Sequence, residues 1–211
     1  MHKGGTHIII DSSGLSVHGA KEIFDAQGGK PIEKRGYRRL HIAINEYQEI
    51  TACELTTLHG DETKQVSKLL KKIHDHCEFI LADKNYDTQR VYHAIKKFRP
   101  TRFIKPVKRD TYSILIPPQS NAKIRKRNCK FPLERSCHAS HIKEHGVLDW
   151  QKATGYGKRS LVEVAFYRYK KILGRVMHSI DFDNQKVEAQ LACKILNIMT
   201  FLGMPETSKV A

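Results

Sequence analysis

Two aspartate residues stand directly behind short apolar segments of the chain. Asp11 follows the run His7–Ile10, and Asp83 follows the run Phe79–Ala82. If both runs are neighbouring strands of an open α/β sheet, their carboxyl ends bring the two carboxylates together where such sheets place ligand sites. Close carboxylates repel each other unless a cation neutralises them, and Mg²⁺ favours such oxygen ligands. The alternative for either aspartate is an ordinary turn or cap at a strand end.

A third carboxylate, Glu163, stands among apolar residues in the segment Ser160–Phe166. Burial of an unpaired charge is costly, so this side chain needs a partner. One candidate partner is a metal ion. The other is Arg159, which lies one helical turn earlier and would form an ordinary i,i+4 ion pair. The residues alone leave both partners open.

Four residues around Glu163 have a specific spacing, Tyr156-x2-Arg159-x3-Glu163-x6-Lys170. This pattern resembles the Tyr-Arg-Glu-Lys signature of DDE transposases from bacterial insertion sequences, in particular the insertion-sequence-four- and -five-like group. Further segments are similar to that group and extend the resemblance over nearly the whole chain: Asp11–Leu15, Arg39–His41, Leu81–Thr88, Ile116–Pro118 and Met199–Glu206. One departure is Asn85, where the group usually has glycine; asparagine tolerates the left-handed conformation better than most residues.

The resemblance implies an α/β fold of the ribonuclease-H-like type, with a central mixed β-sheet and helices on both faces. It also implies metal-dependent DNA strand cleavage and strand transfer. In that reading Asp11, Asp83 and Glu163 are the catalytic residues and hold two Mg²⁺ or Mn²⁺ ions, which Asp11 bridges. Two such ions activate a water or a DNA 3′-OH and stabilise the leaving oxygen.

The resemblance further assigns Tyr156, Arg159 and Lys170 to DNA binding. A guanidinium and an ammonium beside a metal site can hold phosphates. Lys170 lies seven residues, or two helical turns, after Glu163 and is expected on the same side of the helix. Tyr156 is explained equally well by packing. Other basic residues could extend a phosphate track or belong to a solvated loop: Lys108, Lys123, Arg125, Lys126 and Arg127.

The net charge indicates a polyanionic partner. The 211-residue chain has 37 Lys and Arg residues against 22 Asp and Glu, a formal net charge of +15. Residues 121–175 hold fourteen of the basic residues and four of the acidic ones, and so carry +10 of that charge. Such a field attracts nucleic acid, although a basic surface without a partner is the alternative. We expect double-stranded DNA as the partner, both transposon ends and target. Family analogy adds a homodimer, because two ends must be joined.

The elements that position these residues alternate between short apolar strands and helices, which predicts a sheet covered on both faces. The expected strands are 7–10, 39–44, 50–55, 79–82, 103–104 and 114–116. The first ends in a polar turn at Asp11–Gly14, and the next two form a hairpin that makes the sheet mixed. The expected helices are one capped by Asp61, then 88–98, 159–173 and 185–202. An apolar stripe runs along the last helix: Val187, Leu191, Ile195, Ile198 and Leu202.

The five cysteines do not resemble a disulfide framework. Three have apolar neighbours and are expected in the core: Cys53, Cys77 and Cys193. Four residues have zinc-ligand side chains at a spacing that fits no zinc motif: Cys129, Cys137, His138 and His141. No segment approaches the roughly 20 apolar residues that span a bilayer, and no signal peptide is visible. We expect a cytoplasmic protein acting on the bacterial nucleoid, with no membrane partner and no small-molecule cofactor.

We expect residues 1–211 to form a single catalytic domain with a basic, irregular insertion at about 119–150. Members of the group normally carry a DNA-recognition domain before the first catalytic aspartate. Only ten residues precede Asp11, so that N-terminal domain is expected to be absent. Two rival functions are a nuclease of the same fold that cuts without joining, and a truncated, non-catalytic DNA-binding product that inhibits or complements a full-length transposase.

Overall fold

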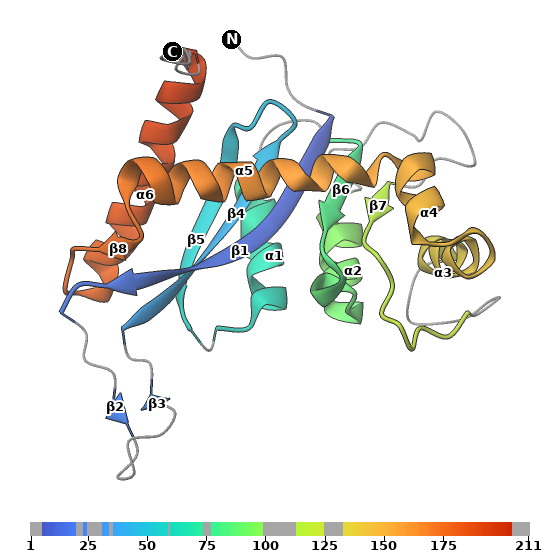
Figure 1. Cartoon of the computed structure of the whole chain (residues 1–211), viewed down its shortest axis with the longest axis horizontal. Coiled ribbons are helices and arrows are strands. Elements are labelled where there is room, and N and C mark those ends of the chain that lie inside the picture. Colours follow the sequence, from blue (N-terminus) through green and yellow to red (C-terminus); the bar gives the residue numbers. More distant parts are fainter. Residues whose placement is uncertain are drawn as a thin grey trace, which may run out of the picture.

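A central β-sheet carries helices in front of it and behind it, as Figure 1 shows. The computed structural model describes these parts of the chain: residues 6–19, 23–24, 31–33, 36–58, 60–73, 77–98, 113–124 and 133–203. The strands of the sheet are β1 (His7–Val17), β4 (Tyr37–Asn45), β5 (Ile50–Thr57), β6 (Phe79–Ala82), β7 (Ile114–Leu115) and β8 (Val176–Met177). Their order is β5-β4-β1-β6-β7, with β8 paired to the far end of β1. Separately, β2 (Ile23–Phe24) pairs with β3 (Pro31–Glu33).

The sheet is mixed, as expected. β1 pairs antiparallel with β4, and β4 pairs antiparallel with β5. In contrast, β6 lies parallel to β1, and β7 lies parallel to β6. The expected hairpin between β4 and β5 turns on Asn45, whose side-chain oxygen accepts the backbone N–H groups of Tyr47 and Glu49, each at 3.0 Å. Asparagine favours turns because it can make such local bonds.

Two helical layers cover the sheet. The helices are α1 (Glu62–Lys72), α2 (Gln89–Phe98), α3 (Leu133–His145), α4 (Val147–Thr154), α5 (Ser160–Arg168) and α6 (Phe182–Phe201). Side chains of β1 alternate between the layers: Ile8 and Ile10 pack with α1 and α2, whereas Ile9 and Leu15 pack with α5 and α6. The expected ribonuclease-H-like α/β fold is therefore confirmed. Within the described ranges, no helix is long and apolar enough to cross a membrane.

The polar segment Asp11–Gly14 belongs to β1 and is not the turn that we expected. Every residue from Asp11 to Ser16 is paired with a residue of β4, so the strand continues to Val17. Backbone pairing with a neighbouring strand overrides the turn preference of Asp, Ser and Gly. The pairing of β1 with β6 ends earlier: Ile10 and Ala82 form the last pair.

The expectation that residues 119–150 are irregular is wrong for residues 133–145, which form α3, and for residues from 147 onward, which form α4. Buried polar contacts hold these helices in place. Arg135 pairs with Asp87 at 2.6 Å, and His138 lies between the carbonyl of Ile114 and the indole of Trp150, at 2.9 Å from each. Because polar side chains make these contacts, no apolar periodicity marks α3. Several expectations concern residues outside the described parts: the strand 103–104, Lys108, Arg125, Lys126, Arg127 and Cys129.

The expected helix 159–173 is confirmed and has three parts. A 3-10 turn, η3 (Tyr156–Arg159), leads into α5, and a π-helical turn, η4 (Tyr169–Leu173), follows it. Gly174 ends the helix with a φ of 101°, a conformation that glycine adopts at little cost.

Helix α6 is confirmed, but it buries a face other than its apolar stripe. An apolar stripe of this length usually faces the core. Here the buried residues are Gln185, Ala189, Cys193 and Leu196, and the five stripe residues are exposed. Gln185 explains part of this choice, because its side-chain oxygen accepts Arg38 Nε at 2.6 Å and its amide donates to the carbonyls of residues 179 and 180. Of the expected core cysteines, Cys77 and Cys193 are buried and Cys53 is half-buried.

Candidate active site

Asp11 and Asp83 lie at the point where β1 and β6 stop pairing. The last parallel pair is Ile10 with Ala82, so each aspartate is the residue that directly follows this pair along the chain. Farther along, the same edge of β1 pairs with β8 only from Ser16 onward. In the described part of the chain, the edge of β1 between these pairings therefore has no neighbouring strand. The expected meeting of the two aspartates at neighbouring strands is observed, even though β1 itself continues.

The side chains of Asp11 and Ser13 face the layer that contains α5. Their orientation follows from strand alternation, since Ile9 and Leu15 on the same face pack in that layer. In Figure 1, α5 crosses in front of the sheet, over β1. Asp11 and Ser13 thus form a polar patch on β1 that lies beneath α5. The charged residues Arg159 and Lys170 lie just before and just after α5.

Asp83 also caps a helical turn, which was the alternative role for it. Its carboxylate accepts the backbone N–H of Asn85 at 2.8 Å and the Asn85 side-chain amide at 3.2 Å, at the start of η1 (Lys84–Tyr86). Capping leaves the carboxylate beside Asp11, so the two roles are compatible. Asn85 lies in this 3-10 turn and is not among the residues with positive φ. Its replacement of the usual glycine is therefore free of the strain that we considered.

One guanidinium connects the three carboxylates. Arg159 Nη2 lies 2.7 Å from Asp11 Oδ2 and 4.0 Å from Asp83 Oδ2. Arg159 Nη1 donates to Glu163 Oε1, which is the i,i+4 ion pair considered from the sequence. The exposed fraction of the side chain rises from 14% at Asp11 through 26% at Asp83 to 61% at Glu163. The three carboxylates are therefore shielded from solvent at the sheet and accessible to solvent at α5.

Burial dominates the electrostatics of Asp11. It raises the pKa of this carboxyl above its ordinary value. The backbone N–H of Ser12, at 2.8 Å, and the charge of Arg159 lower the pKa again, and the charges of Asp83 and Glu163 raise it further. Asp11 is largely shielded from solvent and has two acidic neighbours, so a cation bound beside it would be stabilised.

Tyr156 supports the end of β6. Its ring is buried and packs against Trp150, with 4.9 Å between ring centroids, and its hydroxyl donates to the carbonyl of Ala82 at 3.1 Å. Ala82 directly precedes Asp83, so this bond holds the strand end beside the carboxylates. The structure gives Tyr156 the packing role considered for it, and contact with DNA stays a prediction.

Lys170 lies at the other end of the patch on β1. Its ammonium donates to Ser13 Oγ at 2.7 Å, two residues beyond Asp11. Burial and the charge of Arg175 lower the pKa of this ammonium from its ordinary value. Arg159 and Lys170 thus both reach β1 from the helical layer. Of the other basic residues considered, Lys123 is exposed.

Two of the residues considered as zinc ligands, His138 and His141, have partners within the protein. His138 is buried: its Nδ1 accepts the indole N–H of Trp150, so its Nε2 carries the proton that is donated to the Ile114 carbonyl. His141 pairs with Asp149, and Cys137 is exposed. Sequence reasoning missed this role of His138, and it missed the buried pair of Arg135 with Asp87. The only signal for Asp87 was its position in the segment Leu81–Thr88.

Comparison with known proteins identifies the family. The profile of the family described as Transposase DDE domain matches residues 2–198 of the chain. This chain belongs to the transposase DDE domain family. Among solved structures, the cryo-EM structure of the piggyBac transposase synaptic complex with hairpin DNA is similar with a TM-score of 0.36 and 10% sequence identity. That match covers 99% of this chain and 55% of the piggyBac chain, so this DDE domain spans about half the length of that transposase.

DDE transposases typically use divalent metal ions, and the residues of this DDE domain fit such ions by their chemistry. Three carboxylates converge on one cationic group, and carboxylate oxygens are the ligands that Mg²⁺ and Mn²⁺ favour. Across the residues that the structure describes, no three His, Cys, Asp or Glu side chains are already grouped as a metal site. In this DDE domain Arg159 lies between the carboxylates and supplies their counter-charge.

Proposed function

We propose that this DDE transposase domain cleaves DNA at the ends of an insertion sequence of the four- and five-like group and joins the freed ends to target DNA. Asp11, Asp83 and Glu163 would hold two Mg²⁺ or Mn²⁺ ions. The convergence of these three carboxylates on Arg159 is the observation that supports the proposal. The protein would act on double-stranded DNA of the bacterial nucleoid, as a homodimer that brings two ends together.

Each carboxylate has a place in this proposal that follows from its surroundings. Asp11 is the most enclosed of the three and has acidic neighbours on both sides, which suits a ligand shared between two ions. Asp83 is fixed by its capping bond to Asn85. Glu163 is the most exposed and lies on the side from which DNA would approach. When bound, the divalent ions supply an activated water or 3′-OH and neutralise the leaving oxygen.

Arg159 and Lys170 would position the DNA backbone. A guanidinium can bind phosphate oxygens in a bidentate manner, and an ammonium acts as a point charge for the same group. Both lie over the polar patch of β1, at Asp11 and at Ser13. The scissile phosphate would lie between them, next to the carboxylates.

The test is a cleavage and strand-transfer assay with Mn²⁺ or Mg²⁺ on DNA that carries the terminal sequences flanking the gene. We expect metal-dependent nicks and joined products from the native chain, and a loss of at least about a hundredfold in Glu163→Gln. Glu144→Gln is the matched control, because Glu144 is an exposed glutamate of α3. Nicks without joined products would favour a nuclease. DNA binding without any cleavage would favour a non-catalytic product that inhibits or complements a full-length transposase.

A further inference from the structure

Helix α6 presents an apolar face that nothing in the described part of the chain covers. The exposed fractions of four of its residues and of its C-cap, Leu202, range from 45% to 77%: Val187, Leu191, Ile195, Ile198 and Leu202. Together these side chains expose on the order of 500 Å² of apolar surface, which is within the range of the largest patch on a typical monomer, and such patches are often functional. The buried face of the same helix is formed by Gln185, Ala189, Cys193 and Leu196, so α6 has two packing faces and one of them is open.

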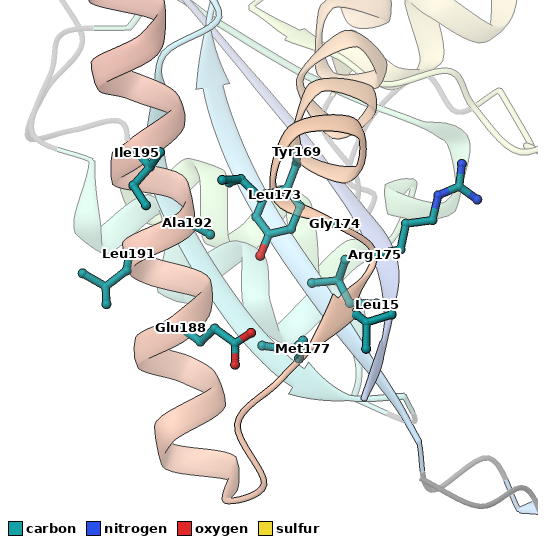
Figure 2. A pocket seen from close by; sticks show the side chains of 11 residues that line it. Leu15, Tyr169, Leu173, Gly174, Arg175, Met177, Glu188, Leu191, Ala192 and Ile195 are labelled. Carbon is teal, nitrogen blue, oxygen red and sulfur yellow. The ribbon is translucent and has the colours of Figure 1, made fainter. Parts of the chain in front are cut away.

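A pocket adjoins this face. It has a volume of about 220 Å³ and lies between α6, the π-helical turn η4 and β8 (Figure 2). Leu191 and Ile195 belong to both the exposed face and the pocket lining. Leu173 and Tyr169 line the pocket from the opposite side. The open face therefore combines projecting apolar side chains with a hollow that can receive one.

The spacing of the exposed residues is nearly the same in both directions along the helix. Val187 lies seven residues before Lys194, and Leu202 lies seven residues after Ile195. Leu191 lies three residues before Lys194, and Ile198 lies three residues after Ile195. A twofold axis between positions 194 and 195 would therefore match Val187 with Leu202 and Leu191 with Ile198 along two antiparallel copies, and would place Ile195 beside Lys194 of the second copy.

We infer that this face binds a second copy of the chain, with two α6 helices packed antiparallel about that axis. Val187 then lies against Leu202 of the second copy, and Leu191 lies against Ile198. A twofold interface needs a patch that is complementary to itself, which this spacing provides. The steps from Leu191 to Leu202 are four, three and four residues, the alternation found in the seam of paired helices.

The size and charge of the face fit this occupant. Specific interfaces bury about 800 Å² on each partner. The stripe together with the half-exposed Val176 of the pocket lining supplies most of that area. None of the five stripe residues is charged. Lys194 lies beside the axis, where its aliphatic stem can cover the stripe while its ammonium stays in water. This inference does not depend on the chemistry proposed for the carboxylates, although joining two DNA ends would use such a dimer.

Sedimentation velocity of the full chain tests the interface, after nuclease treatment and at high salt so that DNA cannot link copies. We expect the native chain to sediment as a dimer at micromolar concentration. Leu191→Asp and Ile198→Asp should each raise the dimer dissociation constant at least about tenfold, because the twofold axis places each new charge in the apolar seam twice. Leu148→Asp is the control, since Leu148 is 74% exposed on α4 and outside the stripe. A native chain that is monomeric up to about 100 μM overturns the inference. A dimer that both stripe variants leave intact does the same.

Cross-linking tests the antiparallel arrangement. In a chain with Cys129→Ser and Cys137→Ser, the single changes Val187→Cys and Leu202→Cys are prepared separately and then mixed under mild oxidation. We expect a disulfide between the two different variants and little within either one, because positions 187 and 202 lie about 22 Å apart along the helix. Cross-linking within the Val187→Cys variant alone would overturn the antiparallel pairing. Circular dichroism confirms that each variant is folded, and DNA cleavage, assayed separately, decides the catalytic proposal.

Discussion

The guanidinium of Arg159 donates to the carboxylate of Asp11 at 2.7 Å, across 148 residues of sequence. The same group reaches Asp83 and Glu163, so one cation faces three anions. A divalent ion bound to these carboxylates would compete with Arg159 for the same charges. The arginine would then be available for the DNA backbone, which links metal binding to DNA binding.

Arg159→Gln should therefore bind Mn²⁺ more tightly in the absence of DNA, by about fivefold or more, because three carboxylates lose their counter-charge. Its affinity for DNA should fall at the same time, since a phosphate ligand is lost. Isothermal titration calorimetry measures both. Lys158→Gln is the control, because Lys158 is the adjacent cation and contacts His7 rather than the carboxylates. Weaker Mn²⁺ binding in Arg159→Gln would show that the arginine organises the carboxylates instead of competing with the metal.

Asp11→Asn should raise the melting temperature of the metal-free protein at pH 7, by on the order of 2 °C. Burial raises the pKa of Asp11 in the folded state above its ordinary value of 3.8. As the pH rises between the ordinary and the raised pKa, the unfolded chain loses this proton first, so the folded state becomes less stable. Below the ordinary pKa the carboxyl is protonated in both states, and the difference between native and variant should vanish.

Asp61→Asn should lower the melting temperature at pH 7, which is the opposite change, in the same thermal melts. The pKa of Asp61 is lowered, mainly by the hydroxyl of Thr63, and its carboxylate caps α1. Its contribution to stability is present above the ordinary pKa and is lost as the pH falls. An Asp11→Asn variant that melts lower than the native chain at pH 7 would mean that the bond to Arg159 outweighs the cost of burial.

Tyr156→Phe should lower the free energy of unfolding by about 1 kcal/mol, because the Ala82 carbonyl loses its side-chain donor. We also expect weaker Mn²⁺ binding, since the end of β6 carries Asp83, and DNA affinity shows whether the hydroxyl also contacts DNA. Urea denaturation, calorimetry and a DNA-binding titration give the three values. A variant of native stability with impaired DNA binding would assign Tyr156 to DNA and not to packing.

Arg135→Ala should lower the free energy of unfolding by about 3 kcal/mol or more, because it leaves the buried carboxylate of Asp87 without its bidentate partner. Lys186→Ala, which breaks the exposed pair with Asp183, should change it by less than about 0.5 kcal/mol. Urea denaturation compares the two. Similar small losses in both variants would show that α3 is held by its apolar contacts instead.

The candidate site was predictable to the extent that its signals are local. Asp83 follows a short apolar run that ends at a helical turn, and this strand end was predicted correctly. Asp11 was placed correctly but in the wrong local structure, because pairing with β4 extends its strand through polar residues. The ion pair between Arg159 and Glu163 was visible at i,i+4. Its extension to the aspartates was not, because contacts across so much sequence leave no periodic trace.

The helices likewise divide into those that the sequence predicts and those that it does not. Helices α1, α2 and α5 carry apolar periodicity and were expected, whereas α3 is anchored by Arg135 and His138 and was not. The apolar stripe predicted the helix α6 correctly. Its periodicity did not show which face of the helix packs against the core. Gln185 accounts for part of that choice, because its side chain makes three hydrogen bonds on the buried side.

Trp150 is the single tryptophan of the chain, so tryptophan fluorescence, excited selectively beside the tyrosines, reports on one position. Its ring packs on Tyr156, whose hydroxyl holds the carbonyl next to Asp83. Its indole N–H is bonded to His138, which joins α3 to β7. An event that displaces the end of β6 would therefore alter the environment of this fluorophore. If a ligand that reaches the carboxylates displaces this strand end, tryptophan emission would follow its arrival in real time without an attached dye.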